Sequence, residues 1–257
     1  MKKAVSIFIL DVSDSSKFEN GRELSTYLYD CQNMLESLNN VIKIKSKYRM
    51  GDEIICLVEG YSSAIMIANY LIYNWYYEEN MPYFGLSCGL IDEDINDIDI
   101  ETWNHLLVKK ARIANDLIKE EKNRKGLIEF NPLNKFNDNE IELINTLLDL
   151  QSAIIVDQTN KQREILGLYS LIRSQKEIAN KINKSTSTVS GHYTGGKSDL
   201  ILEAAKSVCS FLTIKEIQSG RSTEGEDEYL DIVHVVQKKH EELEKEIRKQ
   251  ILNYRFS

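Results

Sequence analysis

Residues 4–12, AVSIFILDV, form an apolar run rich in β-branched side chains. The polar residues 13–16 follow it directly, and a run bounded in this way predicts a central β-strand. Asp11 interrupts the run after about seven residues, and no small-residue cleavage site follows, so we do not expect a signal peptide. The chain therefore starts with a buried strand that ends in a carboxylate.

Hydrophobic periodicity continues as alternating strands and helices through residue 130. Apolar residues recur at helical spacing over 22–38, and two strand-like runs, 41–48 and 53–58, are joined across the hairpin turn Gly51-Asp52. Further along, we expect a helix over 62–77, a strand over 83–90, a helix over 102–124 and a short strand over 127–130. The order βαββαβ predicts an α+β fold, a ferredoxin-like palm whose helices lie on one face of the sheet.

Beyond Pro132 the chain is helical in pattern. The predicted helices span 139–156, 161–172, 175–182, 187–193, 199–212 and 229–253, and the polar stretch 217–228 is expected to be a loop. We therefore expect two domains, residues 1–132 and residues 133–257. The last helix carries a long apolar stripe in which His240 is expected to pack at the core edge. A stripe of this length can pack on its own chain or pair with a partner helix, and we expect a homodimer.

The composition is that of a globular protein of 257 residues, a length that suggests two modules. Twelve glycines and two prolines leave few obligatory turns, which favours long helices. The net charge of −8 argues against a protein that coats nucleic acid without specificity. The four cysteines have no metal-binding or redox spacing, which predicts free thiols in the cytoplasm, and no apolar segment is long enough to span a membrane.

Two carboxylates stand at positions that a palm fold brings together. Asp11 ends the first strand and Asp52 lies at the tip of the following hairpin, so we expect their side chains to be neighbours. Paired carboxylates are ligands for hard divalent cations such as Mg²⁺ or Mn²⁺, which in turn bind nucleotide phosphates. The alternative is that Asp11 caps a loop and that Asp52 is an ordinary turn residue.

A strand that ends in an aspartate, followed by a Gly-Asp hairpin, resembles the class III nucleotidyl cyclases. The resemblance implies that Asp11 and Asp52 hold the metals. It also implies that Ser13, Ser15 and Ser16 line the phosphate side of a nucleotide site.

The chain departs from the cyclase pattern at two positions. Arg112 takes the place of the catalytic arginine, but Val108 stands four residues before it, where the cyclases have asparagine. Tyr48 stands where they have a base-selecting lysine, although Lys47 is adjacent to it. The resemblance therefore supports the fold more directly than it supports catalysis.

Two further motifs are better explained without a ligand. Residues 191–198, GHYTGGKS, match the P-loop pattern, but a P-loop follows a buried strand, and residues 184–190 contain one large apolar residue, Val189. The acidic stretch 92–101 lacks the sixth-position glycine and the final glutamate of an EF-hand, so we expect a solvated loop.

Residues 175–190 have the pattern of a helix-turn-helix. Asn183 tolerates the left-handed turn, and the small Ala179 lets Val189 of the second helix approach the first. Seven Lys and Arg against three Asp and Glu make residues 161–200 net +4, a locally basic surface. We expect Lys176, Lys181 and Lys184 to contact DNA phosphates, and Thr186, Ser187, Thr188, Ser190 and His192 to face the groove. The alternative is a three-helix packing or protein-contact module.

The order of these motifs resembles the bacterial SatD family, which joins a cyclase-like N-terminal region to a C-terminal helix-turn-helix. The residues that carry the resemblance are 9–15 (ILDVSDS), 50–53 (MGDE), 110–112 (KAR), 147–150 (LLDL), 159–162 (TNKQ), 175–179 (QKEIA) and 187–190 (STVS). It implies a regulatory protein that binds double-stranded DNA and binds or senses a nucleoside triphosphate or cyclic nucleotide. The alternatives are a metal-dependent nucleotidyl cyclase or cyclic-oligonucleotide synthase, and a scaffold with neither activity.

Overall fold

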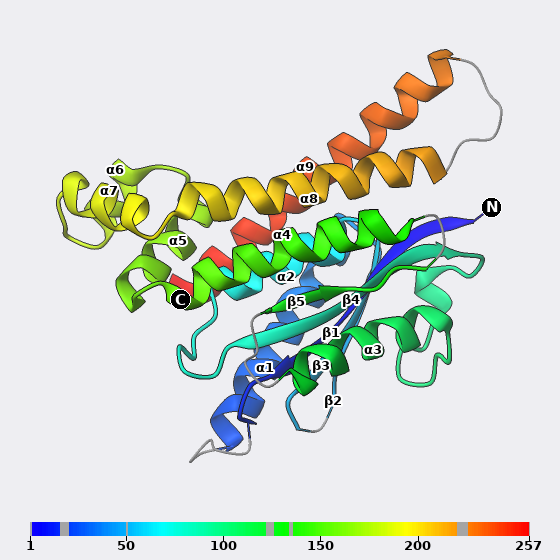
Figure 1. The fold of residues 1–257 in the computed structure, drawn as a ribbon, viewed down its shortest axis with the longest axis horizontal. Helices are drawn as coiled ribbons and strands as arrows, with labels where there is room; N and C mark the ends of the chain where they lie inside the picture. Colours follow the sequence, from blue (N-terminus) through cyan, green and yellow to red (C-terminus); the bar gives the residue numbers. More distant parts are fainter. Residues whose placement is uncertain are drawn as a thin grey trace.

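The computed structural model describes residues 2–15, 21–49, 51–121, 126–133, 136–219 and 226–256. It is a mixed α+β structure, as predicted, in which one sheet lies against long helices (Figure 1). The elements follow the predicted order βαββαβ and then a helix and a short strand. In the part of the chain described, no helix combines the length and apolar character of a membrane span.

β1 (Lys3–Val12) is the central strand of the sheet, as expected from its apolar run. The strand order is β2 (Ile44–Arg49), β3 (Glu53–Glu59), β1, β4 (Pro82–Ile91) and β5 (Ile128–Phe130). β1 pairs antiparallel with both of its neighbours, whereas β5 joins β4 in parallel. Leu10 lies opposite Ile54 on one side and Phe84 on the other.

Helices cover both faces of the sheet. The two helices of the βαββαβ unit share one face, as predicted, and α3 (Leu106–Glu120), which follows that unit, covers the other. Phe8 and Leu10 belong to a buried cluster with α1 (Gly21–Ser37) and α2 (Ser63–Tyr73). Ile7 and Ile9 point to the opposite face and pack under α3. The sequence of β1 explains why both faces are covered. Successive side chains of a strand alternate between the two faces, so β1 places apolar side chains on each face, and each apolar face is buried by packing against helices.

α3 approaches the sheet unusually closely at Gly85 of β4. A Cβ atom at this position would lie 2.1 Å from the carbonyl oxygen of Ala111 and 2.3 Å from the amide nitrogen of Asn115. Only a glycine fits between strand and helix here. Gly85 therefore fixes the height of α3 above the sheet.

The C-terminal half of the chain packs onto α2. Its helices are α4 (Asp138–Asp157), α5 (Asn160–Ile172), α6 (Gln175–Lys181), α7 (Thr186–Gly195), α8 (Ser198–Ser219) and α9 (Glu226–Phe256). One continuous buried cluster contains Phe8 of the sheet, Ile67 of α2, Leu148 of α4 and Ile247 of α9. The buried cluster thus contains residues from both sides of position 132. The division into two domains at that position stays a prediction.

Several element boundaries differ from those predicted by periodicity. α2 ends at Tyr73, not at residue 77, because Trp75 and the tyrosines after it pack against Tyr27 outside the helix. The predicted bounds of the loop, 217–228, are wrong at both ends. α8 continues through buried Ile217 to Ser219, and α9 begins at Glu226.

His240 of α9 packs at the core edge, as predicted. Its Nε2 lies 2.6 Å from the hydroxyl of buried Ser62, and its Nδ1 lies 3.1 Å from the hydroxyl of Thr213. Burial lowers the pKa of His240 below its ordinary value. These contacts tie α9 to the start of α2 and to α8.

Candidate functional site

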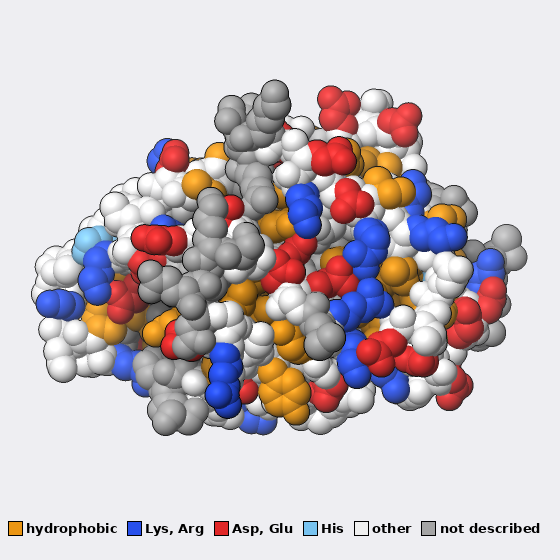
Figure 2. Space-filling model, turned by 90° about the horizontal axis from the view of Figure 1, so that it is seen from below, with side chains coloured by type: hydrophobic (Ala, Val, Ile, Leu, Met, Phe, Trp, Pro, Cys, Tyr) orange, Lys and Arg blue, Asp and Glu red, His pale blue; other side chains and the backbone are white. Residues whose placement is uncertain are grey.

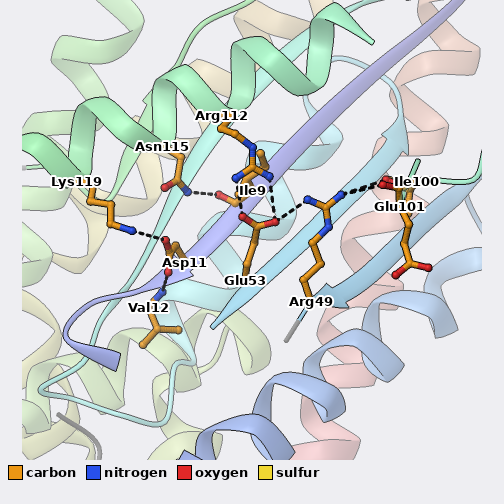
Figure 3. A network of polar contacts seen from close by, with 10 residues as sticks. All are labelled: Ile9, Asp11, Val12, Arg49, Glu53, Ile100, Glu101, Arg112, Asn115 and Lys119. Atoms are coloured by element: carbon orange, nitrogen blue, oxygen red, sulfur yellow. Dashed lines mark hydrogen bonds and ion pairs between the residues drawn. The ribbon is translucent and has the colours of Figure 1, made fainter. Parts of the chain in front are cut away.

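The α3 face of the sheet changes from apolar to charged at one end. Side chains alternate along a strand, so Ile7 and Ile9 of β1 are followed on the same face by Asp11, and Ile55 of β3 is preceded by Glu53. α3 lies over this end and presents polar residues to it (Figure 3). Those residues share one helical face, at a spacing of three and four: Arg112, Asn115 and Lys119.

Asp11 lies beside Asp52 in this charged end. Only 9% of Asp11 is exposed, and its Oδ1 accepts a hydrogen bond from the Val12 amide at 2.9 Å. Burial and the adjacent Asp52 carboxylate raise the pKa of Asp11 above its ordinary value, and a hydrogen bond from Tyr83 opposes the shift. The ammonium of Lys119 lies 3.6 Å from Asp11 Oδ2, outside hydrogen-bond distance. The buried Asp11 and the half-buried Asp52 thus form an acidic pair, and the ammonium of Lys119 lies near it.

The carboxylate of Glu53 binds the guanidinium of Arg112. Arg112 donates two hydrogen bonds to the Glu53 carboxylate, at 2.8 and 3.1 Å, and Arg49 donates a third at 3.0 Å (Figure 3). The hydrogen bonds that Arg112 donates to Glu53 raise the pKa of Arg112. In this geometry Arg112 is bound to Glu53 and not to the Asp11–Asp52 pair.

The other nucleotide-site residues predicted from the sequence lie near the ends of β1 and β2. Ser13 donates its amide to the carbonyl of Met81 at 3.1 Å, and its own carbonyl accepts from the side chain of Asn80 at 3.0 Å. Ser15 follows in the same loop, and Ser16 lies outside the described residues. Lys47 is half-buried, and its ammonium lies 3.4 Å from the carboxylate of Glu101.

Asp11 and Asp52 are the side chains at this end that could hold a divalent cation. No group of three or more His, Cys, Asp or Glu side chains arranged for a metal occurs among the residues described. A Mg²⁺ or Mn²⁺ ion prefers six oxygen ligands, so two carboxylates would leave most positions to water and to phosphate oxygens. The donor set therefore fits a cation that arrives with a phosphate ligand.

Sequence reasoning missed Glu53, Asn115 and Lys119 in this site. Strand alternation puts Glu53 on the face of Asp11, and the helical spacing after Arg112 puts the other two beside it. Buried Asn115 donates to the carbonyl of Ile9 at 2.9 Å. These periodic patterns become informative only once α3 is known to cover this face.

A second candidate surface lies at the far end of the molecule, where α6 and α7 extend away from the sheet (Figure 1). α5, α6 and α7 share a small core of their own. Its buried residues are Ile165, Leu168, Ile178, Ala179 and Val189. The predicted contact of Ala179 and Val189 is thus part of a three-helix unit.

The connection between α6 and α7 has the turn chemistry that the sequence predicts. Asn183 takes a left-handed conformation with φ of 52°, and the Lys184 amide donates to the carbonyl of Ala179 at 2.9 Å. Ser185 caps α7, because its hydroxyl accepts the Thr188 amide at 3.1 Å. The turn is therefore held by local hydrogen bonds at both ends.

The outer surface of α6 and α7 is polar and basic. The three predicted phosphate-contacting lysines are exposed, as are the first-turn residues Thr186, Ser187 and Thr188, whereas Ser190 and His192 are half-buried. Figure 2 shows Lys and Arg side chains among uncharged polar surface at the left end of the molecule, where Figure 1 draws α6 and α7.

The two rejected motifs have structural roles. Gly191 and Gly195 lie inside α7, so the P-loop-like string follows no strand. In the acidic stretch, Asp94 pairs with the ammonium groups of Lys3 and Lys43.

Comparison of the chain with protein-family models, with curated proteins and with solved structures finds no match.

Proposed function

We propose that the protein is a DNA-binding regulatory protein of the SatD type, which contacts double-stranded DNA through α6 and α7. The observation that carries this proposal is the α6–α7 connection, in which left-handed Asn183 and the Ser185 cap join two short helices over a shared core. A helix-turn-helix reads DNA with the N-terminal residues of its second helix. In this chain those residues are Thr186, Ser187 and Thr188, all exposed.

The charge distribution supports the same surface. The chain is net −8, whereas residues 161–200 are net +4. Lys176 and Lys181 of α6 and Lys184 of the turn before α7 are exposed. Backbone phosphates are bound by such lysines, and hydroxyl side chains can donate to or accept from base edges.

Fluorescence anisotropy with labelled duplex DNA from the region upstream of the protein's own reading frame tests this proposal. The full-length protein is titrated at several salt concentrations and compared with the Lys176→Glu/Lys181→Glu variant. We expect salt-dependent binding whose slope of log affinity against log salt falls by roughly two in the variant. The matched control, Lys109→Glu/Lys238→Glu, reverses two exposed lysines on α3 and α9 and should bind like the wild type. Salt-independent binding, or equal loss in both variants, would contradict the proposal.

We further propose that the charged end of the sheet binds a nucleotide together with Mg²⁺ or Mn²⁺. The strand order β2-β3-β1-β4 is that of a ferredoxin-like palm, and it supports a cyclase-like origin of this half. The adjacency of Asp11 and Asp52 favours a shared cation. The engagement of Arg112 by Glu53 favours binding over turnover, because the two guanidinium groups described at this end of the sheet, those of Arg49 and Arg112, are both bound to Glu53.

Electron paramagnetic resonance of free Mn²⁺ tests the nucleotide site directly. The protein is titrated with Mn²⁺ in the presence of each non-hydrolysable nucleoside triphosphate analogue, and pyrophosphate release is measured with the natural triphosphates. We expect nucleotide-dependent Mn²⁺ uptake that Asp11→Asn abolishes and that Asp157→Asn, an exposed carboxylate of α4, leaves intact. Uptake unchanged by Asp11→Asn would exclude the proposed ligand pair. Pyrophosphate release that requires Asp11 would favour the alternative of a cyclase or oligonucleotide synthase.

A further inference from the structure

α4 has apolar side chains on two of its sides. One side faces the interior of the chain and carries the buried residues of the helix. A second row follows at a spacing of four and three residues, which places side chains on one side of a helix: Leu143, Leu147, Leu150 and Ile154. Leu143 and Leu150 are 60% and 59% exposed, and the other two are half-buried. The second row is therefore not needed for the core of this chain.

α8 lies beside α4, and the two helices run antiparallel along the length of the molecule (Figure 1). Near one end, the ammonium of Lys215 pairs with the carboxylate of Glu140 at 2.5 Å. Near the other end, the side chain of Gln158 donates to the carbonyl of Gly196 at 2.5 Å. Because these contacts span residues 140–158 of α4, the helices lie alongside each other for about 27 Å at a rise of 1.5 Å per residue.

α8 continues the apolar row of α4. Leu200, Phe211 and Ile214 share one side of the helix, because they stand eleven and three positions apart. The ammonium of Lys215 lies 5.5 Å from the centre of the Phe211 ring and pairs with Glu140, so this side of α8 borders α4. Leu200 and Ile214 are 50% and 51% exposed. We call the two apolar rows together the α4–α8 face.

The α4–α8 face belongs to a part of the chain with few charges. Residues 143–156 and 200–214 contain three charged side chains, Asp149, Glu203 and Lys206, whereas 28% of all residues in the chain are charged. The solvated side of a helix is ordinarily charged or polar, and the core of a protein interface is depleted in charge. The composition of this face is that of a surface that becomes buried on association.

The size of the face matches a small protein–protein interface. Two helices, each about 10 Å wide and in contact over about 27 Å, offer roughly 540 Å² on each copy, or about 1,100 Å² in total. This area exceeds the roughly 1,000 Å² that a specific interface needs and lies at the weak end of the range. The apolar stripe of α9 is not available in the same way, because Leu243, Ile247 and Ile251 are buried within the chain.

We propose that the α4–α8 face binds a second copy of this chain and forms a homodimer. The choice of a second copy as the partner rests on the DNA-binding function proposed above. α4 leads directly into α5, and α7 leads directly into α8, so the face ends at the three-helix unit. A twofold axis parallel to α4 and α8 places the three-helix units of both copies at the same end of the dimer, where they can contact two half-sites of one duplex.

Sedimentation velocity of the full-length protein without DNA tests the dimer independently of DNA binding. We expect a monomer–dimer equilibrium at concentrations up to about 100 μM, because an interface of this size is weak. Leu150→Glu/Ile214→Glu introduces charge into the face and should weaken the dimer at least tenfold. The matched control, Leu106→Glu/Leu117→Glu, changes two apolar residues of α3 that are 54% and 52% exposed, and it should dimerise like the wild type.

Amide hydrogen exchange of the wild type gives a second measurement that needs no substitution. We expect slower exchange in peptides of α4 and α8 at high than at low protein concentration, with exchange in α3 unchanged. A monomer throughout this concentration range would overturn the proposal. A dimer that Leu150→Glu/Ile214→Glu leaves intact, or that the control variant weakens equally, would overturn it as well.

DNA binding separates this proposal from the one on which it rests. A dimer that is weakened by the face variant but does not bind duplex DNA would support the α4–α8 interface and contradict the DNA-binding function. A protein that binds DNA and stays monomeric at all these concentrations would overturn the interface and leave the DNA-binding function supported.

Discussion

The charged end of the sheet and the outer surface of α6 and α7 satisfy their polar groups in different ways. At the sheet end, Glu53 is bound by two arginines and Asp11 shares its environment with Asp52 and Lys119. At the start of α7, the hydroxyls of Ser187 and Thr188 each form a hydrogen bond with the hydroxyl of the N-cap residue Ser185, and all three residues remain exposed. The first region holds its charged groups partly buried and paired, whereas the second presents its polar groups to solvent.

This difference predicts different binding behaviour. A ligand at the sheet end must displace existing partners, so it has to bring its own positive charge, as a metal-bound phosphate does. A phosphate backbone that binds at α6 and α7 releases condensed counterions, so we expect binding there to depend strongly on salt.

The largest effect is expected from Gly85→Ala, which acts on the sheet end alone. The new Cβ would lie 2.1 Å from the Ala111 carbonyl oxygen, so α3 must move away and carry Arg112 and Lys119 with it. We expect a loss of about 3 kcal/mol in the free energy of unfolding, measured by urea denaturation, and loss of nucleotide-dependent Mn²⁺ uptake. Gly191→Ala in α7, where nothing lies within 4 Å of a new Cβ, is the control and should be neutral or slightly stabilising.

A smaller effect is expected from Val189→Ala in the core of the three-helix unit. Val189 is fully buried against α5 and α6, so the truncation should cost about 2 kcal/mol locally. We expect faster amide hydrogen exchange in α6 and α7 and weaker DNA binding, with Mn²⁺ uptake unchanged. Val156→Ala, on an exposed part of α4, is the matched truncation. Equal exchange in the two variants would show that the unit does not rest on this contact.

Glu53→Gln should have a modest effect on stability and a distinct one on ligand binding. The change removes the charge that holds Arg112 and Arg49, at a cost of about 1 kcal/mol for a partly exposed pair. Because Arg112 is then available, we expect tighter binding of the nucleotide analogue in the Mn²⁺ titration. Glu101→Gln, which removes the exposed carboxylate paired with Lys47, serves as the control. Weaker nucleotide binding in Glu53→Gln would indicate that Glu53 itself supports the ligand.

The smallest effect concerns the pH dependence of Asp11. Burial and Asp52 raise the pKa of Asp11 above 3.8 in the folded state. The folded protein therefore holds this proton more tightly than the unfolded chain, and stability is lost as the pH rises through the raised pKa. We expect Asp11→Asn to be more stable than the wild type at neutral pH, with the Tm difference shrinking as the pH falls toward 4. A difference that grows on acidification would contradict this assignment.

Local chemistry accounts for the features that the sequence predicts well. The turn between α6 and α7 follows from Asn183 and Ser185, whose side chains favour a left-handed turn and a helix cap regardless of their surroundings. The side-by-side position of Asp11 and Asp52 follows from a strand end and a hairpin tip in a βαββαβ order. The error at 217–228 shows the limit of this reasoning, because the helix there is extended by burial of Ile217 and by the bond of Glu216 to the amide of Tyr61.

By itself, the sequence determined the order of the elements, the central place of β1 and the turn of the three-helix unit. Each of these depends on residues close together in the chain. Only the tertiary structure decided that α3 covers the opposite face of the sheet, that Glu53 takes Arg112 away from the carboxylate pair, and that α4 and α8 together expose an apolar face. These features join segments distant in sequence, and they depend on which faces pack together, a choice that periodicity leaves open.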